Sequence, residues 1–214
     1  MKEKLLRVKE FFIKNIRWIL VFICLIIFFI ILDNILDKEI EQFDNQIYNL
    51  LSKIISNPLT VFLKIITTIG SAYVIIPVCI VSVIYFWKKK ESKYIAVNLI
   101  TIFFSNQLLK RIIERPRPEG FRIVEEAGFS FPSGHSMVSM AFYGFFIYLI
   151  YKKVKNKHIK WVSISLICIL ILLIGVSRIY LGVHYASDVF GGFVLSISYL
   201  GLFTHIIKTM FKEV

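Results

Sequence analysis

Residues 18–32 read WILVFICLIIFFIIL, an apolar run without a single charge. A helix crosses the ~30 Å hydrocarbon layer of a membrane with roughly 20 residues, or with fewer where flanking side chains reach the interface. Across the 214 residues the apolar fraction is 57%, above that of soluble proteins. The composition argues against a soluble globule and against a disordered chain, and it predicts an integral membrane protein.

Six uncharged runs predict six transmembrane helices in an all-α membrane protein, with one domain over residues 1–214. The first run has no small-residue cleavage signature after Leu32, so we expect a retained helix and not a signal peptide. The three cysteines each fall inside a run, which favours buried packing over a disulfide or metal framework. These are Cys24, Cys79 and Cys168. The runs cover Trp18–Leu32, Ile65–Trp87, Tyr94–Leu109, Ser136–Tyr151, Trp161–Ser177 and Val189–Thr204.

The segment between the first two runs has the period of an amphipathic helix. Its apolar residues recur at three- and four-residue steps and so share one face of a helix, and Pro58 ends the pattern. We expect an interfacial helix on the outer surface of the membrane, with a lid or a lipid gate as the alternative. The apolar residues are Ile40, Phe43, Ile47, Leu50 and Ile54.

The distribution of basic residues predicts that both termini are cytoplasmic. Six spans place the termini on one side, and 17 of the 26 Lys and Arg residues fall on that side against 9 on the other. Cytoplasmic segments carry such an excess, and Trp18, Trp87 and Trp161 then all lie at cytoplasmic interfaces. The net charge of +12 therefore reflects topology and an anionic substrate, and no nucleic-acid partner is expected.

One cationic segment lies on the side that has few basic residues. Residues 110–118 read KRIIERPRP and place four cations within eight positions. Basic residues that set the orientation of a membrane protein lie in its cytoplasmic segments, so a basic cluster on the outer face needs another explanation. It predicts binding of a phosphate group. The alternative is an ordinary solvated loop.

A second polar segment, Pro132-Ser133-Gly134-His135-Ser136, directly precedes the fourth run. Ser133 can cap the helix that follows, and the free N–H groups of the first turn can face an anion. The alternative is a simple serine cap beside an incidental histidine.

The third segment contains Ser177-Arg178, His184 and Asp188. Residues four apart share a helix face, so the carboxylate can accept a hydrogen bond from one imidazole nitrogen and leave the other as a nucleophile. Alone, such a pair is more often structural. Counting alternate spans, however, puts all three segments on one face of the membrane, where polar groups are costly unless they converge on a partner. The sequence therefore predicts a single site.

Together, residues 110–118, 132–135 and 177–188 resemble the three-part signature of the type 2 phosphatidic acid phosphatase superfamily. The matching patterns are Lys110-x6-Arg117-Pro118, Pro132-Ser133-Gly134-His135 and Ser177-Arg178-x5-His184-x3-Asp188. No position departs from the signature. Within the superfamily the chain resembles bacterial membrane lipid phosphatases of the phosphatidylglycerophosphatase B and undecaprenyl-diphosphatase type, and not the soluble haloperoxidases.

This resemblance implies a role for each matching residue. His184 would attack phosphorus, Asp188 would fix the imidazole tautomer, and His135 would protonate the departing lipid oxygen. The phosphoryl oxygens would be held by Lys110, Arg117, Arg178, the Ser133 hydroxyl and the Gly134 N–H.

No metal and no other cofactor is expected, because the cations can hold the phosphate and no zinc or magnesium ligand spacing occurs elsewhere. The remaining charges of this region are interpreted as solvated, with contacts to a lipid headgroup as the alternative. They are Arg111, Glu114, Arg115 and Arg122.

We therefore expect a phosphatase that removes the terminal phosphate of a lipid at the outer face of a bacterial cytoplasmic membrane. The possible substrates are undecaprenyl diphosphate, phosphatidylglycerol phosphate and phosphatidate, and the expected partners are this lipid and the bilayer. A phosphoryl transferase and a non-catalytic lipid transporter or scaffold are the alternatives. The sequence predicts no particular oligomeric state.

Overall fold

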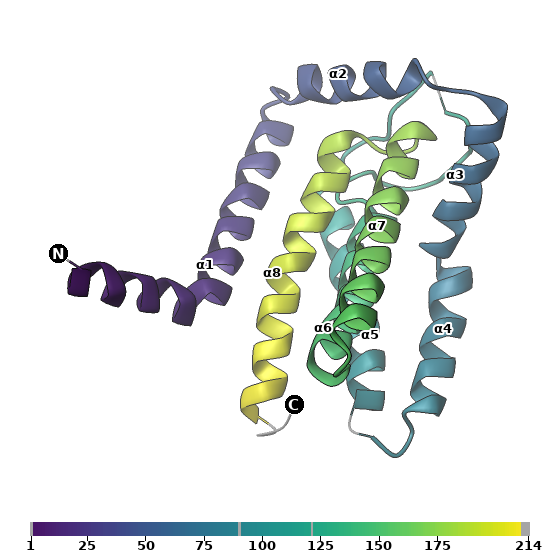
Figure 1. The fold of residues 1–214 in the computed structure, drawn as a ribbon. Coiled ribbons are helices and arrows are strands. Elements are labelled where there is room, and N and C mark those ends of the chain that lie inside the picture. Colours follow the sequence, from purple (N-terminus) through teal and green to yellow (C-terminus); the bar gives the residue numbers. More distant parts are fainter. Residues whose placement is uncertain (1, 90, 121, 211–214) are drawn as a thin grey trace.

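The computed structural model describes residues 2–89, 91–120 and 122–210, and its regular elements are all helices. The all-helical prediction is confirmed for this part of the chain. The helices α3 to α8 and the part of α1 that leads to α2 run along the bundle, and α2 lies across one end (Figure 1). The helices are α1 (Lys2–Leu36), α2 (Glu41–Ser52), α3 (Asn57–Ile69), α4 (Ala72–Tyr85), α5 (Glu91–Ile113), α6 (Gly134–Lys153), α7 (Lys157–Tyr180) and α8 (Ala186–Met210).

The helices α1, α7 and α8 are long and apolar enough to cross a membrane, over Asn15–Leu36, Lys157–Tyr180 and Ala186–Thr209. The pair α3 and α4 also qualifies if it is counted as one span bent by 43°. The predicted run Ile65–Trp87 therefore contains a break, which falls at Gly70 and Ser71. The structure thus gives three or four candidate spans, and the count of six stays a prediction.

The helices α5 and α6 coincide with the third and fourth predicted runs, but both turn polar side chains inward. Asn98 and Asn106 of α5 and Ser136 and Ser139 of α6 are buried. Asn98 donates a hydrogen bond to the Ala141 carbonyl oxygen, which ties the two helices together at 2.9 Å. Their lower apolar content follows from their place inside the bundle.

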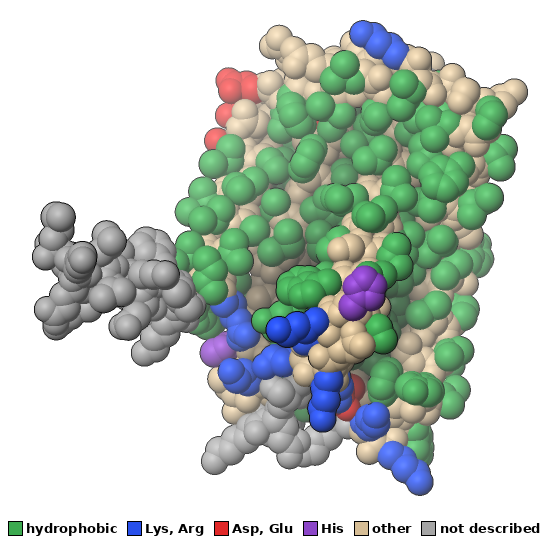
Figure 2. Space-filling view, viewed as in Figure 1, with side chains coloured by type: hydrophobic (Ala, Val, Ile, Leu, Met, Phe, Trp, Pro, Cys, Tyr) green, Lys and Arg blue, Asp and Glu red, His purple; other side chains and the backbone are tan. Residues whose placement is uncertain are grey.

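The core lies around α6, which packs against α5, α7 and α8, while α1 packs on α8 and α3 on α7. Its side chains include Ile95, Phe142 and Ile174, all fully buried. The outward faces of the bundle carry exposed apolar side chains, such as Phe29, Val81 and Leu166. On the face drawn in Figure 2, hydrophobic side chains cover much of the surface between the two ends of the molecule, which suits a lipid environment.

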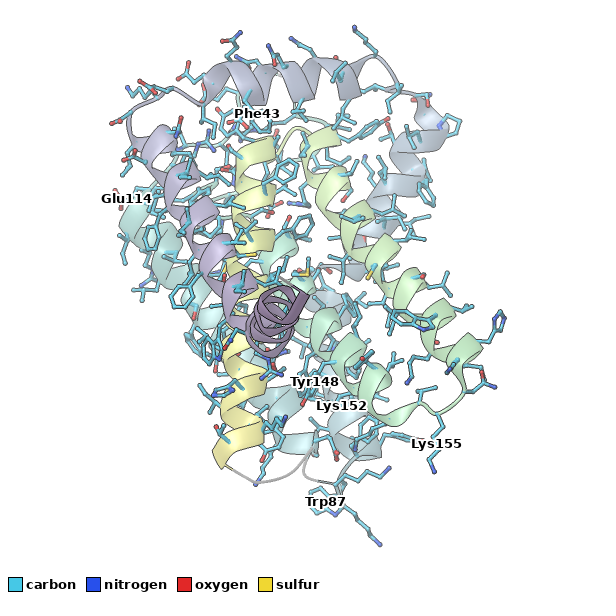
Figure 3. The ribbon with its side chains drawn as sticks, turned by 60° about the vertical axis from the view of Figure 1, so that its left-hand side comes forward. Phe43, Trp87, Glu114, Tyr148, Lys152 and Lys155 are labelled. Atoms are coloured by element: carbon cyan, nitrogen blue, oxygen red, sulfur yellow. The ribbon has the colours of Figure 1, made fainter. Side chains whose placement is uncertain are left out.

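The two ends of the bundle differ in charge. Phe43 of α2 lies at one end, and Trp87, Lys152 and Lys155 lie at the other (Figure 3). On the face in Figure 2, most Lys and Arg side chains gather at the end away from α2. Lys90 and Lys212, which enter the charge count, lie outside the described residues.

Two local expectations need correction. Cys168 is exposed on the outer face of α7, whereas Cys24 and Cys79 are buried as predicted. The expected amphipathic helix is present as α2, but it ends at Ser52, and Pro58 lies in the first turn of α3. Proline suits a first turn because the missing N–H has no partner there in any case. That α2 lies at the membrane interface stays a prediction.

Candidate active site

The three polar segments meet at the end of the bundle that α2 covers. The eight predicted site residues are thereby brought to one region, although their roles in catalysis stay predictions. Lys110 lies in the last turn of α5 and Arg178 in the last turn of α7. Ser133 is the N-cap of α6, and Asp188 lies in the first turn of α8. His184 lies in the turn between α7 and α8, and Arg117 in the connection that joins α5 to α6.

Ser133 fixes the start of α6 against α8. Its Oγ accepts a hydrogen bond from the Ser136 N–H at 3.5 Å and another from the Ser136 hydroxyl at 3.0 Å. Its own N–H donates to the Asp188 carbonyl oxygen at 3.1 Å. The N-terminus of α6 therefore sits next to the first turn of α8, where its dipole favours an anion.

His184 and Asp188 form a buried pair. The imidazole Nδ1 lies 3.3 Å from Asp188 Oδ2, and Nε2 lies 3.0 Å from Nη1 of Arg117. A guanidinium can only donate hydrogen bonds, so Nε2 presents its lone pair to Arg117 and Nδ1 carries the proton toward the carboxylate. This is the tautomer in which Nε2 is free to act as a nucleophile.

Burial also keeps this imidazole neutral. Removal from water lowers the pKa of His184 well below the usual value of a histidine, and the Arg178 and Arg117 charges act in the same direction. The Asp188 carboxylate raises the pKa but does not outweigh burial. The unprotonated nitrogen that a nucleophile requires is therefore present at neutral pH.

Asp188 is completely buried, and both of its carboxylate oxygens accept hydrogen bonds. Oδ2 accepts from the Ser130 hydroxyl and from the Tyr185 N–H, the latter at 2.9 Å, in addition to its contact with His184. Ser130 Oγ also lies 3.3 Å from His184 Nδ1. Sequence reasoning missed Ser130, because it stands before the recognised segment and nothing in its local pattern sets it apart.

The three predicted phosphate-binding cations are held by backbone and hydroxyl oxygens. Lys110 Nζ donates to the Phe129 carbonyl oxygen and, at 3.3 Å, to that of Ser130. Arg117 donates to the carbonyl oxygens of Gly128, Ala127 and Val183 at 2.9, 3.1 and 2.9 Å. Arg178 Nη1 donates to Thr67 Oγ1 at 2.8 Å. These neutral acceptors help to orient the three side chains.

One acidic residue stands between two of these cations. Glu126 pairs through Oε2 with Nη2 of Arg178, and its Oε1 lies 3.6 Å from Nη2 of Arg117. Sequence reasoning missed this contact, because Glu125 and Glu126 look alike in the sequence. The carboxylate occupies a position in which an anionic ligand could reach both guanidinium groups.

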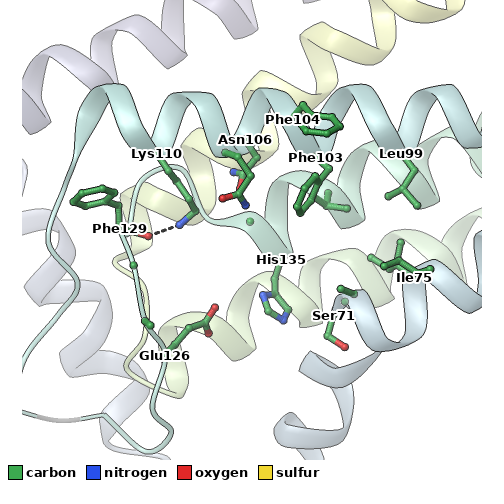
Figure 4. A pocket seen from close by; sticks show the side chains of 18 of the residues that line it. Ser71, Ile75, Leu99, Phe103, Phe104, Asn106, Lys110, Glu126, Phe129 and His135 are labelled. Atoms are coloured by element: carbon green, nitrogen blue, oxygen red, sulfur yellow. Dashed lines mark hydrogen bonds between the residues drawn. The ribbon is translucent and has the colours of Figure 1, made fainter.

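A cavity of about 690 Å³ reaches this region from the side of the bundle. Lys110, Glu126 and His135 lie around its polar part (Figure 4), and Arg117 lines it as well. Ser71, Asn106, Gln107 and Arg111 also line it, and the remaining wall is apolar and comes mostly from α4 and α5. These residues include Ile75, Ile76, Leu99, Phe103 and Phe104.

The cavity is shaped for an amphiphilic ligand. Ile76 and Phe104 line it and are 50% and 65% exposed, so part of its apolar wall is open to the surroundings of the molecule. Arg117 and Glu126 line it as well, and each contacts a residue that is not part of the wall, His184 and Arg178 respectively. A ligand can therefore place an apolar tail between α4 and α5 and an anionic group at the cations.

The interpretation of Arg115 as a solvated charge is wrong. Only 9% of its side chain is exposed, and its guanidinium joins Asp188 to Asp44 of α2. By contrast, Arg111 and Glu114 are exposed, and Arg122 donates to the Pro118 carbonyl oxygen at 2.6 Å. In the described ranges there is no group of three or more His, Cys, Asp or Glu residues arranged to hold a metal ion.

Comparison with known proteins gives a consistent result. The family model of the PAP2 superfamily matches residues 91–212. Phosphatidylglycerophosphatase B of Bacillus subtilis (strain 168) is 32% identical over 181 residues, which cover 82% of this chain and 89% of that protein. Probable lipid phosphate phosphatase 4 of Arabidopsis thaliana is 27% identical over 172 residues, covering 62% of this chain and 56% of that protein.

Solved structures extend the match to the fold. The first transmembrane PAP2-type phosphatidylglycerolphosphate phosphatase from Bacillus subtilis superimposes with a TM-score of 0.82 at 27% identity, covering 89% of this chain and 96% of that one. Aquifex aeolicus LpxE gives a TM-score of 0.55 at 23% identity, covering 73% and 93%, and this second likeness concerns the fold alone.

The position of Glu126 leads to a testable prediction. If a phosphate group uses Arg117 and Arg178, the carboxylate competes with it, so Glu126→Gln should strengthen inhibition by vanadate, a phosphate mimic, about threefold to tenfold. The measurement is the inhibition constant of the purified protein at constant ionic strength. Glu125→Gln, an equal charge change at an exposed neighbour, should leave it unchanged. Weaker inhibition of Glu126→Gln than of the parent would contradict the competition.

Proposed function

The chain belongs to the PAP2 superfamily and is a membrane lipid phosphatase, and we propose that it removes the terminal phosphate of its lipid through a phosphohistidine on His184. The observation that carries this proposal is the environment of the imidazole. Nδ1 faces the buried Asp188 at 3.3 Å, and Nε2 faces Arg117, a residue of the cavity wall, at 3.0 Å.

Binding comes first in this proposal. The lipid tail lies along the apolar wall from α4 and α5, and the phosphate displaces Glu126 from Arg178 and Arg117. Lys110, the Ser133 hydroxyl and the Gly134 N–H supply further donors at the start of α6. The Nε of Arg178 supports this role, because it is buried and has no hydrogen-bond partner among the described residues.

In the chemical step, His184 attacks phosphorus and His135 acts on the departing oxygen. When the phosphate takes over the Arg117 guanidinium, the Nε2 lone pair of His184 is directed at phosphorus. The N–P bond forms as the bond from phosphorus to the lipid oxygen breaks, and Asp188 stabilises the resulting imidazolium. His135 lines the cavity on the side of the lipid, so it is placed to protonate the departing oxygen.

Hydrolysis of the intermediate completes the cycle. His135, now unprotonated, accepts a proton from a water molecule that attacks phosphorus, and the P–N bond breaks to return His184 with inorganic phosphate. The same cations stabilise charge in both steps. His135 must therefore enter the cycle protonated, and the proton that it takes from water restores this form.

We propose phosphatidylglycerol phosphate as the first substrate to test. The support is that the Bacillus subtilis relative and the solved Bacillus subtilis structure, both of which the chain matches over most of its length, are named as phosphatases of this lipid. Phosphatidate and undecaprenyl diphosphate present the same combination of apolar tail and terminal phosphate, and they form the comparison set.

We further propose six spans, with α3 and α4 as a bent second span, the termini in the cytoplasm and the site at the outer face of a bacterial cytoplasmic membrane. The support is the gathering of Lys and Arg at the end of the bundle opposite α2 (Figure 2). On this arrangement α2 lies at the outer interface, above the site.

The proposed function predicts that phosphate release needs no metal. The purified protein should release inorganic phosphate from phosphatidylglycerol phosphate in excess EDTA, and vanadate should inhibit it as a mimic of the pentacoordinate state. A phosphate assay across the three lipids measures this. Loss of activity on chelation that magnesium restores would refute metal independence, and transfer of the phosphoryl group to a second lipid would favour the transferase.

The dependence of activity on the leaving group should distinguish the role of His135 from that of His184. A general acid contributes roughly 100- to 10,000-fold where the departing oxygen needs a proton, and less where it leaves as a stable anion. His135→Ala should therefore damage hydrolysis of phosphatidate most, that of a lipid diphosphate less and that of p-nitrophenyl phosphate least. The measurement is kcat/KM relative to the parent. Equal losses on all three substrates would mean that His135 mainly positions the phosphate.

Orientation can be tested by thiol labelling in intact cells. In a background without Cys24, Cys79 and Cys168, a cysteine at Glu125 should react with an impermeant reagent, because this exposed residue lies in the connection that joins α5 to α6. A cysteine at Lys155, exposed at the opposite end, should react only after the cells are opened. The reverse pattern would place the site in the cytoplasm.

A further inference from the structure

Arg115 joins two buried carboxylates that come from distant parts of the chain. Its Nη1 lies 2.6 Å from Asp188 Oδ1, and its Nη2 lies 2.8 Å from Asp44 Oδ2. The exposed fraction of the side chain is 9% for Arg115, 1% for Asp44 and 0% for Asp188. Buried charges persist only when they are paired and hydrogen-bonded, so the three groups depend on one another.

Further contacts fix the guanidinium in place. Asp44 accepts hydrogen bonds from the Ser187 N–H at 2.8 Å and from the Ser187 hydroxyl at 2.7 Å, so it ties α2 to the first turn of α8. Arg115 Nη1 donates to the same hydroxyl at 2.7 Å, and its guanidinium carbon lies 4.2 Å from the centre of the Tyr185 ring. A planar group held at both edges and across one face has little freedom to rotate.

The consequence for Asp188 is that its two oxygens have separate tasks. Oδ1 accepts from Arg115, and Oδ2 accepts from Ser130 and the Tyr185 N–H and faces His184. With Oδ1 fixed, the carboxylate plane is fixed, and Oδ2 stays in line with Nδ1. Arg115 does not line the cavity among the described residues, so it has no direct route to a ligand there.

The guanidinium of Arg115 stays positively charged. Burial opposes its charged form, but the Asp188 and Asp44 carboxylates outweigh burial and raise the pKa of the guanidinium above its ordinary value. The residue therefore stays charged at neutral pH and offsets the negative charge of Asp188.

We propose that Arg115 and Asp44 are positioning residues for the reaction: they orient Asp188, and through it His184, so that α2 forms a working part of the active site. The inference rests on the proposed role of His184 as the nucleophile. It assigns to α2 a task other than lying on the membrane surface or forming a lid or a lipid gate.

The test compares kinetic constants of purified variants with p-nitrophenyl phosphate and with phosphatidylglycerol phosphate. Arg115→Met should lower kcat about 10- to 100-fold and change KM less than threefold, as expected when the partner that orients a reacting group is lost. Arg115→Lys should recover part of kcat, because an ammonium can bond one carboxylate at a time. Asp44→Asn should lower kcat less than Arg115→Met.

Two matched control variants test whether the effect depends on where the charge is removed. Glu41→Gln makes the same charge change as Asp44→Asn on an exposed residue of α2, and Arg122→Met removes a guanidinium from the same connection. Both should keep the parent kcat. Thermal unfolding of each purified variant in detergent identifies any variant that fails to fold. If Arg115→Met is such a variant, the kcat values of Arg115→Lys and Asp44→Asn decide the test.

A double-mutant cycle distinguishes positioning from a general structural role. If Arg115 acts through Asp188, then Arg115→Met should cost little further activity in an Asp188→Asn background. An equal loss in both backgrounds, or a parent kcat for Arg115→Met, would overturn the inference. His184→Ala is measured in the same series. If this variant stays active, the proposed function fails. If it is inactive while Arg115→Met keeps the parent kcat, only the positioning role is refuted.

Discussion

The rest of the site depends on the buried carboxylate of Asp188. A charge with no access to water is costly unless several donors satisfy it, and here the donors come from two separate connections between helices. They are Ser130 and Arg115 of the α5–α6 connection and the Tyr185 N–H and the His184 imidazole of the α7–α8 turn, and Arg115 in turn pairs with Asp44 of α2. Each helix end that approaches the site is positioned in part by this one group.

The same end of the bundle combines strong positive charge with an apolar surface. Lys110, Arg117 and Arg178 are oriented mostly by carbonyl and hydroxyl oxygens, so their charge remains available, and Glu126 pairs with two of them. The apolar wall from α4 and α5 begins beside these cations. A lipid phosphate has the same division into a charged end and an apolar tail, which explains why the cavity lies at the side of the bundle and not at its axis.

Much of this arrangement can be predicted from local sequence. Uncharged runs mark the helices, and the spacing of His184 and Asp188 predicts a contact that the structure gives at 3.3 Å. The break at Gly70 is missed because residues 67–71, TTIGS, carry no charge and therefore do not interrupt an uncharged run. The helices α5 and α6 look like ordinary spans in the sequence, yet their polar residues turn inward beside the site.

The residues that were missed share one property: their partners are distant in the chain. Asp44 contacts Ser187, and Glu126 contacts Arg178, so no local pattern separates them from solvated neighbours. Arg115 lies within a recognised segment, but its burial depends on how α2 folds back over α8. Periodicity identifies the face of a helix, whereas contacts between segments require the tertiary structure.

The most direct test of the account is to trap the covalent intermediate. The purified protein is mixed with phosphatidylglycerol phosphate labelled in its terminal phosphate, quenched with base within one turnover, and digested for mass spectrometry. The account predicts a base-stable, acid-labile phosphoryl group on His184, which is absent from His184→Ala. A phosphoryl group on another residue, or full turnover by His184→Ala, would contradict the assignment of His184 as the nucleophile.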